Sequence, residues 1–319
     1  LGDVYKRQTV SYVAQPPCPQ GLVMEVHEVV LTDADRICYK TLDDVPYITV
    51  EREGCKRLFM SGIIGNVLQA TIRRQADDVF RTISHIMIAE QMPVSSIVRQ
   101  WNYIEKITDC DVTGHQHYQD FNDARSLFYQ SAQWLDGYPA ATGIGTQWGG
   151  VMIDIDALFC QDKTVCVKAV DNPLQVSAHA YSQNVLLGEK DEKLNKKTTP
   201  KFERAKSMTF DDRQLIYISG TAAIRGEESL TGVGLERQLH ITMENIAQLT
   251  GDAHLKLLRV YLKDKSHYQE AYKLLNDYQL NIPISYMCAD VCRDELLIEI
   301  EGIAIKSVSY THLTLPTIR

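Results

Sequence analysis

The sequence lacks several features that would assign it to a common class. It has no long apolar run free of charged residues, so no membrane-spanning helix is predicted. It has no P-loop, HExxH, GxSxG or strand–helix glycine fingerprint, which argues against nucleotide, zincin, serine-hydrolase and dinucleotide chemistry. The formal charge of −8 comes without a basic stripe, so nucleic acid is not an expected partner.

The cysteines and histidines of the sequence predict neither a disulfide framework nor a metal site. The eight cysteines of this 319-residue chain include no CxxC pair, and their spacing predicts no disulfide framework. Cys160 with Cys166, or Cys288 with Cys292, could pair in principle, but reduced thiols in a cytoplasmic protein are the expectation. The "HQH" at 115–117 has no third ligand nearby, so neither a metal nor an organic cofactor is predicted.

What is present is a globular composition, with 45% hydrophobic and 23% charged residues over a length sufficient for two ordinary domains. The two ends differ from the rest. "LGDVYKRQ" at the start and "VSYTHLTLPT" near the end resemble translated transposase-type sequencing adapters. Residues 1–8 and 307–319 are therefore expected to be adapter-derived artefacts and are excluded from the predicted fold.

The central part of the chain contains a weak internal duplication. "RLFMSGIIG" (57–65) in the first copy and "LIYISGTAAI" (215–224) in the second each precede an amphipathic stretch. Both copies continue in the order helix, strand, helix, strand. Each copy is therefore predicted to be an α+β unit, a mixed β-sheet backed by two helices.

This repeat also predicts the domain boundaries. The first unit is expected at 9–185 and the second at 207–306. The charged segment 186–206 is predicted to be an exposed linker. The first helix of each unit is supported by apolar residues at helical spacing, namely Val79, Ile83, Ile86 and Ile88 in one and Leu239, Met243, Ile246 and Leu249 in the other.

The strand "LIEIEGI" near the end of the second copy alternates apolar residues with two acids, Glu299 and Glu301. Period-two alternation places both carboxylates on one face. Asp154 and Asp156 are predicted to take the same places in the first copy. A solvated face is the ordinary interpretation of such a pattern, and a pocket lined by acids is the functional alternative.

Other polar residues lie in otherwise ordered segments. "YQDFNDAR" puts Tyr118, Phe121 and Arg125 on one helical face, and "FERAKSM" supplies Arg204. An arginine beside aromatic rings suits a planar carboxylate, although a surface cation is the plainer interpretation. "SGT" (219–221) ends a strand with N–H groups that could bind an anion, or it is an ordinary strand terminus.

The segments "ISGTAAI", "RQLHITMENIAQL" and "IEIEGIA" resemble the RidA/YjgF family of small trimeric imine deaminases. This resemblance implies two tandem RidA/YjgF-like units in a pseudo-duplicated chain. It also implies a homotrimer, although the duplication permits a monomer. That family binds a substrate carboxylate with an arginine just after a proline. Here Pro283 is followed by Ser285 at that place, and Pro139 by Ala140 and Ala141, so imine deamination is the weaker prediction.

A longer resemblance, from about residue 99 to residue 306, is to the chorismatases. It rests on eight blocks in order, "WNYI", "FNDAR", "YPAATGIG", "NPLQVSAHAY", "FERA", "SGTAAIRGEES", "NIAQL" and "DVCRDELLIEIEG". It implies cleavage of the enolpyruvyl ether of chorismate, a small-molecule substrate, by a lyase or hydrolase. The products would be pyruvate with 3-hydroxybenzoate or a dihydroxycyclohexadiene carboxylate. Glu299 corresponds to that family's catalytic glutamate.

The chemistry of this reaction assigns the candidate residues. Glu299 is predicted to be the general acid, with its pKa raised by burial and by the neighbouring charge of Glu301. The substrate-binding candidates are Arg125, Arg204, Tyr118, Gly220, Thr221 and Cys292. Asp154 is predicted to be a structural relic of the duplication. The alternatives are a RidA-like imine or enamine deaminase and a non-catalytic metabolite-binding protein.

Overall fold

A computed structural model describes residues 9–19, 21, 23–112, 114–161, 165–186, 197–210 and 212–308. The predicted artefact at 1–8 lies outside these residues, as do 309–319 of the one at the other end and 187–196 of the predicted linker.

The first sheet has the strand order β1-β2-β3-β6-β4-β5. Its strands are β1 (Arg36–Leu42), β2 (Val45–Arg52), β3 (Cys55–Ile64), β4 (Ile97–Glu105), β5 (Ala140–Thr146) and β6 (Val151–Cys160). Neighbouring strands are antiparallel except for the parallel pair β4 and β5. The sheet is therefore mixed, as predicted.

The second sheet repeats this arrangement, with the order β13-β12-β14-β9-β8-β7. Its strands are β7 (Cys166–Val170), β8 (Ala205–Thr209), β9 (Arg213–Ala222), β12 (His254–Leu262), β13 (Ile284–Cys288) and β14 (Ile298–Ser307), and a small hairpin, β10 (Ile224–Arg225) with β11 (Glu228–Ser229), follows β9. Again one pair, β12 with β13, is parallel. The duplication is thus confirmed. Because β7 pairs with β8, the first sheet ends before β7, earlier than the domain end predicted at 185.

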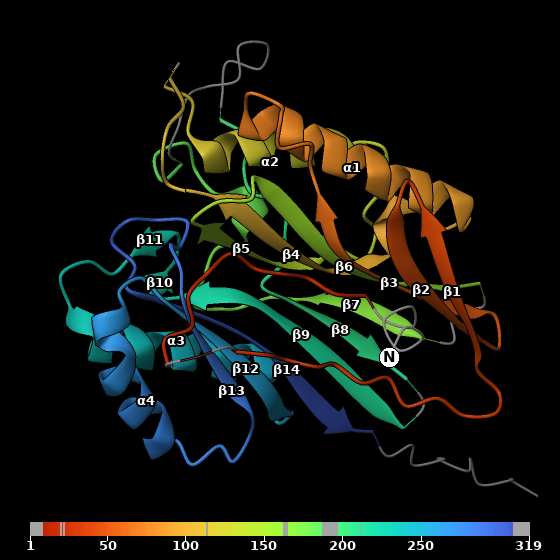
Figure 1. Ribbon diagram of the computed structural model, residues 1–319. Coiled ribbons are helices and arrows are strands. Elements are labelled where there is room, and N and C mark those ends of the chain that lie inside the picture. Colours follow the sequence, from red (N-terminus) through yellow and green to blue (C-terminus); the bar gives the residue numbers. More distant parts are fainter. Residues whose placement is uncertain are drawn as a thin grey trace, which may run out of the picture.

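Two helices belong to each unit, α1 (Ile72–Ala89) and α2 (His117–Tyr129) to the first, and α3 (Gly234–Thr250) and α4 (Tyr268–Asp277) to the second. In Figure 1, α1 and α2 lie over the first sheet while α3 and α4 lie at the opposite side of the molecule. The two sheets therefore lie between the helix pairs, and buried residues from both, such as Trp101 and Tyr261, share one cluster.

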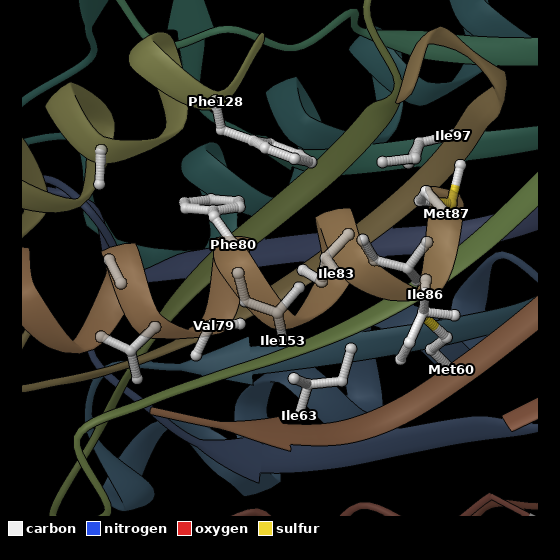
Figure 2. Close-up of a cluster of buried hydrophobic side chains, with 14 of the residues drawn as sticks. Met60, Ile63, Val79, Phe80, Ile83, Ile86, Met87, Ile97, Phe128 and Ile153 are labelled. Carbon is white, nitrogen blue, oxygen red and sulfur yellow. The ribbon is translucent and has the colours of Figure 1, made fainter. Parts of the chain in front are cut away.

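The first helix shows how the apolar pattern becomes a core. The Thr71 hydroxyl caps α1 by accepting from Arg74 N at 3.3 Å. Figure 2 shows Val79, Ile83 and their neighbours on α1 packed against side chains of the sheet beneath. For α3, the first helix of the second unit, the prediction of the buried face is confirmed, since all four of its predicted apolar residues are buried. Ile88 was misassigned, because it is 74% exposed and Met87 occupies the inward position instead.

The prediction of reduced thiols throughout is wrong at one pair. Cys55 and Cys160 form a disulfide, because they lie directly opposite each other on the paired strands β3 and β6. The pairs suggested by sequence spacing do not form, and Cys166, Cys288 and Cys292 are free. Cross-strand register, which brings together residues 105 positions apart, decided the pairing.

Candidate active site

A cleft opens where the β5 edge of the first sheet meets β9 and β14 of the second. It contains about 830 Å³ of empty space, part of it open to solvent. Both units contribute to its wall, the first with Tyr118, Asn122, Arg125, Thr142 and Gly143, and the second with Arg204, Gly220, Cys292, Arg293 and Glu299. The site therefore exists only where the two copies meet.

The structure brings most of the predicted site residues into this one cleft. Those that line it are Tyr118, Arg125, Arg204, Gly220, Cys292 and Glu299. Thr221 and Glu301 are buried but do not line it. Residues from positions 118 to 299 thus converge on a single cleft. The periodicity of apolar residues and the spacing of motifs along the chain could not establish this convergence.

Glu299 is a buried acid without a partner. It lies near the start of β14 and is 5% exposed, and no described residue donates a hydrogen bond to its carboxyl. Burial, followed by the charge of Glu301, raises the pKa of Glu299 to about 8, against a smaller opposing effect of Arg99 and Arg204. At neutral pH this carboxyl is mostly protonated and faces the cleft.

The backbone beside the Glu299 carboxyl must be glycine. A Cβ built at Gly220 would overlap Glu299 Oε1, and it would also lie 3.0 Å from Thr142 Cγ2. The missing side chain at position 220 therefore provides the space in which the acid sits, and this is how Gly220 contributes to the cleft wall.

Glu301 lies on the same face of β14, but its surroundings are opposite in kind. Its carboxylate accepts hydrogen bonds from four side chains, namely Arg99, Trp101 (3.0 Å), Arg259 (3.0 Å) and Tyr261 (3.1 Å). Two of these donors are guanidinium groups, whose hydrogen bonds to a carboxylate are charge-assisted. Glu301 is a fixed negative charge behind the cleft, and the solvated face that the alternation ordinarily implies does not occur here.

Two cleft arginines keep unused donors. Arg125 is 2% exposed; it donates to Asn122 Oδ1 at 2.5 Å, and its guanidinium lies over the Phe121 ring at 5.3 Å. Arg204 donates to Val176 O and to the Tyr181 hydroxyl, both at 2.6 Å. The Nε of each arginine is buried and has no hydrogen-bond partner among the described residues. Such orphaned cationic donors are costly unless a ligand or water accepts from them.

A third cation and two weaker groups complete the polar lining. Arg293 donates to Glu227 O at 2.9 Å and lies over the Tyr181 ring at 5.2 Å. Burial raises the pKa of the Tyr118 hydroxyl above its usual range. Burial, followed by the charge of Glu299, raises the pKa of Cys292 to about 12, so this thiol is a neutral part of the wall and not a thiolate nucleophile.

Two predictions about backbone are corrected. The Gly220 N–H is not free for an anion, because it donates to Thr142 Oγ1 at 2.9 Å, and the Thr221 hydroxyl donates to Ser219 O at 2.8 Å. The strand end is held by the adjoining β5. The later part of the predicted exposed linker is also not exposed, since Pro200, Phe202 and Arg204 line the cleft.

The predicted alignment of the two copies is wrong by two residues. The Ser-Gly bulge of β3 lies opposite Asp154, and the Ser-Gly bulge of β9 lies opposite Glu301. Asp154 therefore corresponds to Glu301, and Met152 to Glu299. A shift of two residues leaves every side chain on the same face, so alternation alone could not reveal it. The first copy has no counterpart of Glu299.

The corresponding space in the first unit is also filled. Ser11 Oγ donates to Asp154 Oδ1 at 2.5 Å, and Thr9 Oγ1 lies 3.0 Å from Ser61 Oγ. A Cβ at Gly62 would lie 2.6 Å from Val10 O. The segment 9–13 thus packs on β3 where β5 packs on β9.

Sequence analysis did not single out three residues of functional interest. Thr142 and Arg293 line the cleft, and Arg99 bridges Thr142 to Glu301. Each lies within or beside a block already noted, "YPAATGIG", "DVCRDELLIEIEG" or "WNYI", but no local pattern distinguishes them from surface residues. Their role depends on partners from the other unit.

Comparison with known proteins agrees with this architecture. A family described as "Chorismatase FkbO/Hyg5-like, N-terminal" matches residues 39–157. A 3-hydroxybenzoate synthase of Streptomyces hygroscopicus is 27% identical over 238 residues, 68% of this chain, and a chorismatase of Streptomyces rapamycinicus is 27% identical over 228 residues, 65% of this chain. The chain is thus similar to chorismatases over about two thirds of its length. The match begins at residue 39, well before the predicted start of resemblance near 99.

A solved chorismatase structure shows the same fold, with a TM-score of 0.68, 18% sequence identity, and coverage of 83% of this chain and 78% of that one. The chain spans 66% and 64% of the length of the two curated relatives, just under two thirds. Within the described residues of this chain, no helix is long and apolar enough to cross a membrane, and no cluster of three or more His, Cys, Asp or Glu suits a metal ion.

Proposed function

We propose that the chain cleaves the enolpyruvyl ether of chorismate and releases pyruvate, with Glu299 as the general acid. The observation that carries this proposal is an unpartnered carboxyl, with a pKa of about 8, facing a cleft whose arginines retain free donors. A carboxylic acid that stays protonated near neutral pH is what protonation of an enol ether requires. The name of one curated relative, a chorismatase, supports the same substrate, and the name of the other, a 3-hydroxybenzoate synthase, matches one of the two proposed ring products.

The cleft suits a dicarboxylate. Arg125 comes from the first unit, whereas Arg204 and Arg293 come from the second. We infer that Arg125 binds one carboxylate of chorismate and that Arg204 with Arg293 binds the other, each through donors left unused by the protein. Tyr118 and Cys292 would then contact the ring between them.

The proposed reaction has three steps, namely protonation, addition of water and collapse of the hemiketal. Glu299 transfers its proton to the terminal methylene, which becomes a methyl group and leaves an oxocarbenium ion. Water adds to the cationic carbon and forms a hemiketal. Collapse of the hemiketal breaks the ether bond and releases pyruvate and the ring alcohol, and the proton lost by the water restores Glu299. The fixed charge of Glu301 favours the protonated state of Glu299 and stabilises the cation that follows.

A second outcome shares the first step. If the ring rearranges and aromatises, 3-hydroxybenzoate and pyruvate form with no net uptake of water. Hydrolysis gives pyruvate and a dihydroxycyclohexadiene carboxylate. Both routes begin with proton transfer from Glu299, so the ring product separates the lyase from the hydrolase.

The test is pyruvate release from chorismate by the wild-type chain and by Glu299→Gln. Glu295→Gln, an exposed acid just before β14, is the matched control. We expect wild type and control to release pyruvate and Glu299→Gln to be near background, with chromatography naming the ring product. Folded wild type that releases no pyruvate would overturn the proposal, and release of ammonia from an imino acid would favour a deaminase instead.

A further inference from the structure

Thr142 is an acceptor of two hydrogen bonds in the cleft wall. Its Oγ1 accepts from Arg99 Nη2 at 2.6 Å and from Gly220 N at 2.9 Å, and the residue is 3% exposed. A hydroxyl oxygen has two acceptor positions and one hydrogen. Both acceptor positions are therefore occupied by protein N–H groups.

Neither of these bonds can be reversed. A guanidinium and a backbone amide N–H are donors only, so the Thr142 hydroxyl cannot donate to Arg99 or to Gly220. Within the described part of the chain, no protein atom accepts its hydrogen. Thr142 lines the cleft, so a molecule bound in the cleft can supply the acceptor for this hydrogen.

We propose that Thr142 is a substrate-binding residue that donates its hydroxyl hydrogen to the carboxylate of the enolpyruvyl group. This inference rests on the proposed function. The Thr142 and Glu299 side chains are neighbours, since a Cβ built at Gly220 would overlap Glu299 Oε1 and would lie 3.0 Å from the Thr142 methyl carbon Cγ2. A group held by Thr142 is therefore next to the acid.

The chemistry selects the carboxylate over the ether oxygen. The ether oxygen becomes positively polarised when the methylene is protonated, so a hydrogen bond donated to it would oppose the reaction. The carboxylate stays negative throughout, and a hydroxyl donor keeps its full benefit in the transition state. Anchored there, the enolpyruvyl group directs its methylene toward Glu299.

The donor is held in place from behind. Asn102 Nδ2 donates to Thr142 O at 2.8 Å. Arg99 also donates to Glu301 and lies over the Trp101 ring at 4.6 Å. The hydroxyl is thus oriented by a buried network that joins β4 and β5 of one unit to β9 and β14 of the other, which reduces the entropy lost on binding.

The experiment uses Glu299→Gln as the parent, because this variant is expected to bind chorismate without cleaving it. Thr142→Val or Thr142→Ser is then added, and Kd is measured by calorimetry for chorismate and for 3-hydroxybenzoate, which lacks the enolpyruvyl group. We expect Thr142→Val to weaken chorismate binding about tenfold and Thr142→Ser to stay within twofold. The affinity for 3-hydroxybenzoate should not change in either variant.

Three results would overturn the assignment. In the first, chorismate binds the Thr142→Val variant within twofold of the parent. In the second, both ligands lose affinity together, which would mean that Thr142 only maintains the shape of the cleft. In the third, the parent does not bind chorismate. If the parent binds chorismate but wild type releases no pyruvate, the proposed reaction fails while the binding role of Thr142 is still decided by these Kd values.

Discussion

Replacing Glu299 by glutamine should stabilise the folded chain at alkaline pH while it removes activity. The ordinary glutamate pKa of 4.5 rises to about 8 in the folded chain. The native state therefore prefers the protonated carboxyl, and its stability falls as the pH rises through this interval. Above pH 8 an amide at this position avoids a cost of up to about 5 kcal/mol, at about 1.4 kcal/mol for each tenfold change in proton affinity.

Urea unfolding at pH 5 and at pH 9 measures this effect. At pH 5 the free energies of unfolding of wild type and Glu299→Gln should agree within about 1 kcal/mol, since an isosteric change to a neutral side chain alters little. At pH 9 the variant should be the more stable by several kcal/mol. Every other titrating group cancels in the difference, and Glu295→Gln should show no such pH dependence.

The same carboxyl governs the pH dependence of catalysis. Because the general acid must carry its proton, kcat/KM should fall as pH rises through about 8. A stability difference between Glu299→Gln and wild type that is the same at both pH values would mean that Glu299 ionises normally in the fold. The assignment of Glu299 as the acid would then lose its physical basis.

Two further perturbations test the surroundings of the site and of the first sheet. Gly220→Ala should reduce pyruvate release more than about 100-fold, because the added Cβ displaces the Glu299 carboxyl. The control Gly143→Ala, whose Cβ would lie 3.6 Å from Tyr118, should change pyruvate release only a few-fold. Equal effects of the two substitutions would contradict the role given to Gly220. Cys55→Ser should lower the free energy of unfolding by about 2–4 kcal/mol through loss of the bond to Cys160, measured by urea titration without reductant, and a chain equally stable with and without reductant would show that the bond contributes little.

The sequence by itself determined the elements and most of the cleft. The repeated Ser-Gly strand ends, the amphipathic helices and the alternating last strand predicted two α+β units, and the structure confirms them. The family resemblance selected Glu299, the residue pattern suggested Arg125 and Arg204, and the fold brings all three to one cleft. Local periodicity suffices to predict the helices and strands, because each of them buries one face whatever its partners are.

The family resemblance chose Glu299 over Glu301, but only the tertiary structure supplied the physical difference between the two acids. The two acids share a face and a residue type, yet one is unpartnered and the other accepts from Arg99, which lies 202 positions away in the chain. The two-residue shift between the copies and the Cys55–Cys160 pair were likewise hidden. Alternation fixes which face a side chain takes, but its partners come from strands distant in sequence, and those partners decide which acid keeps its proton.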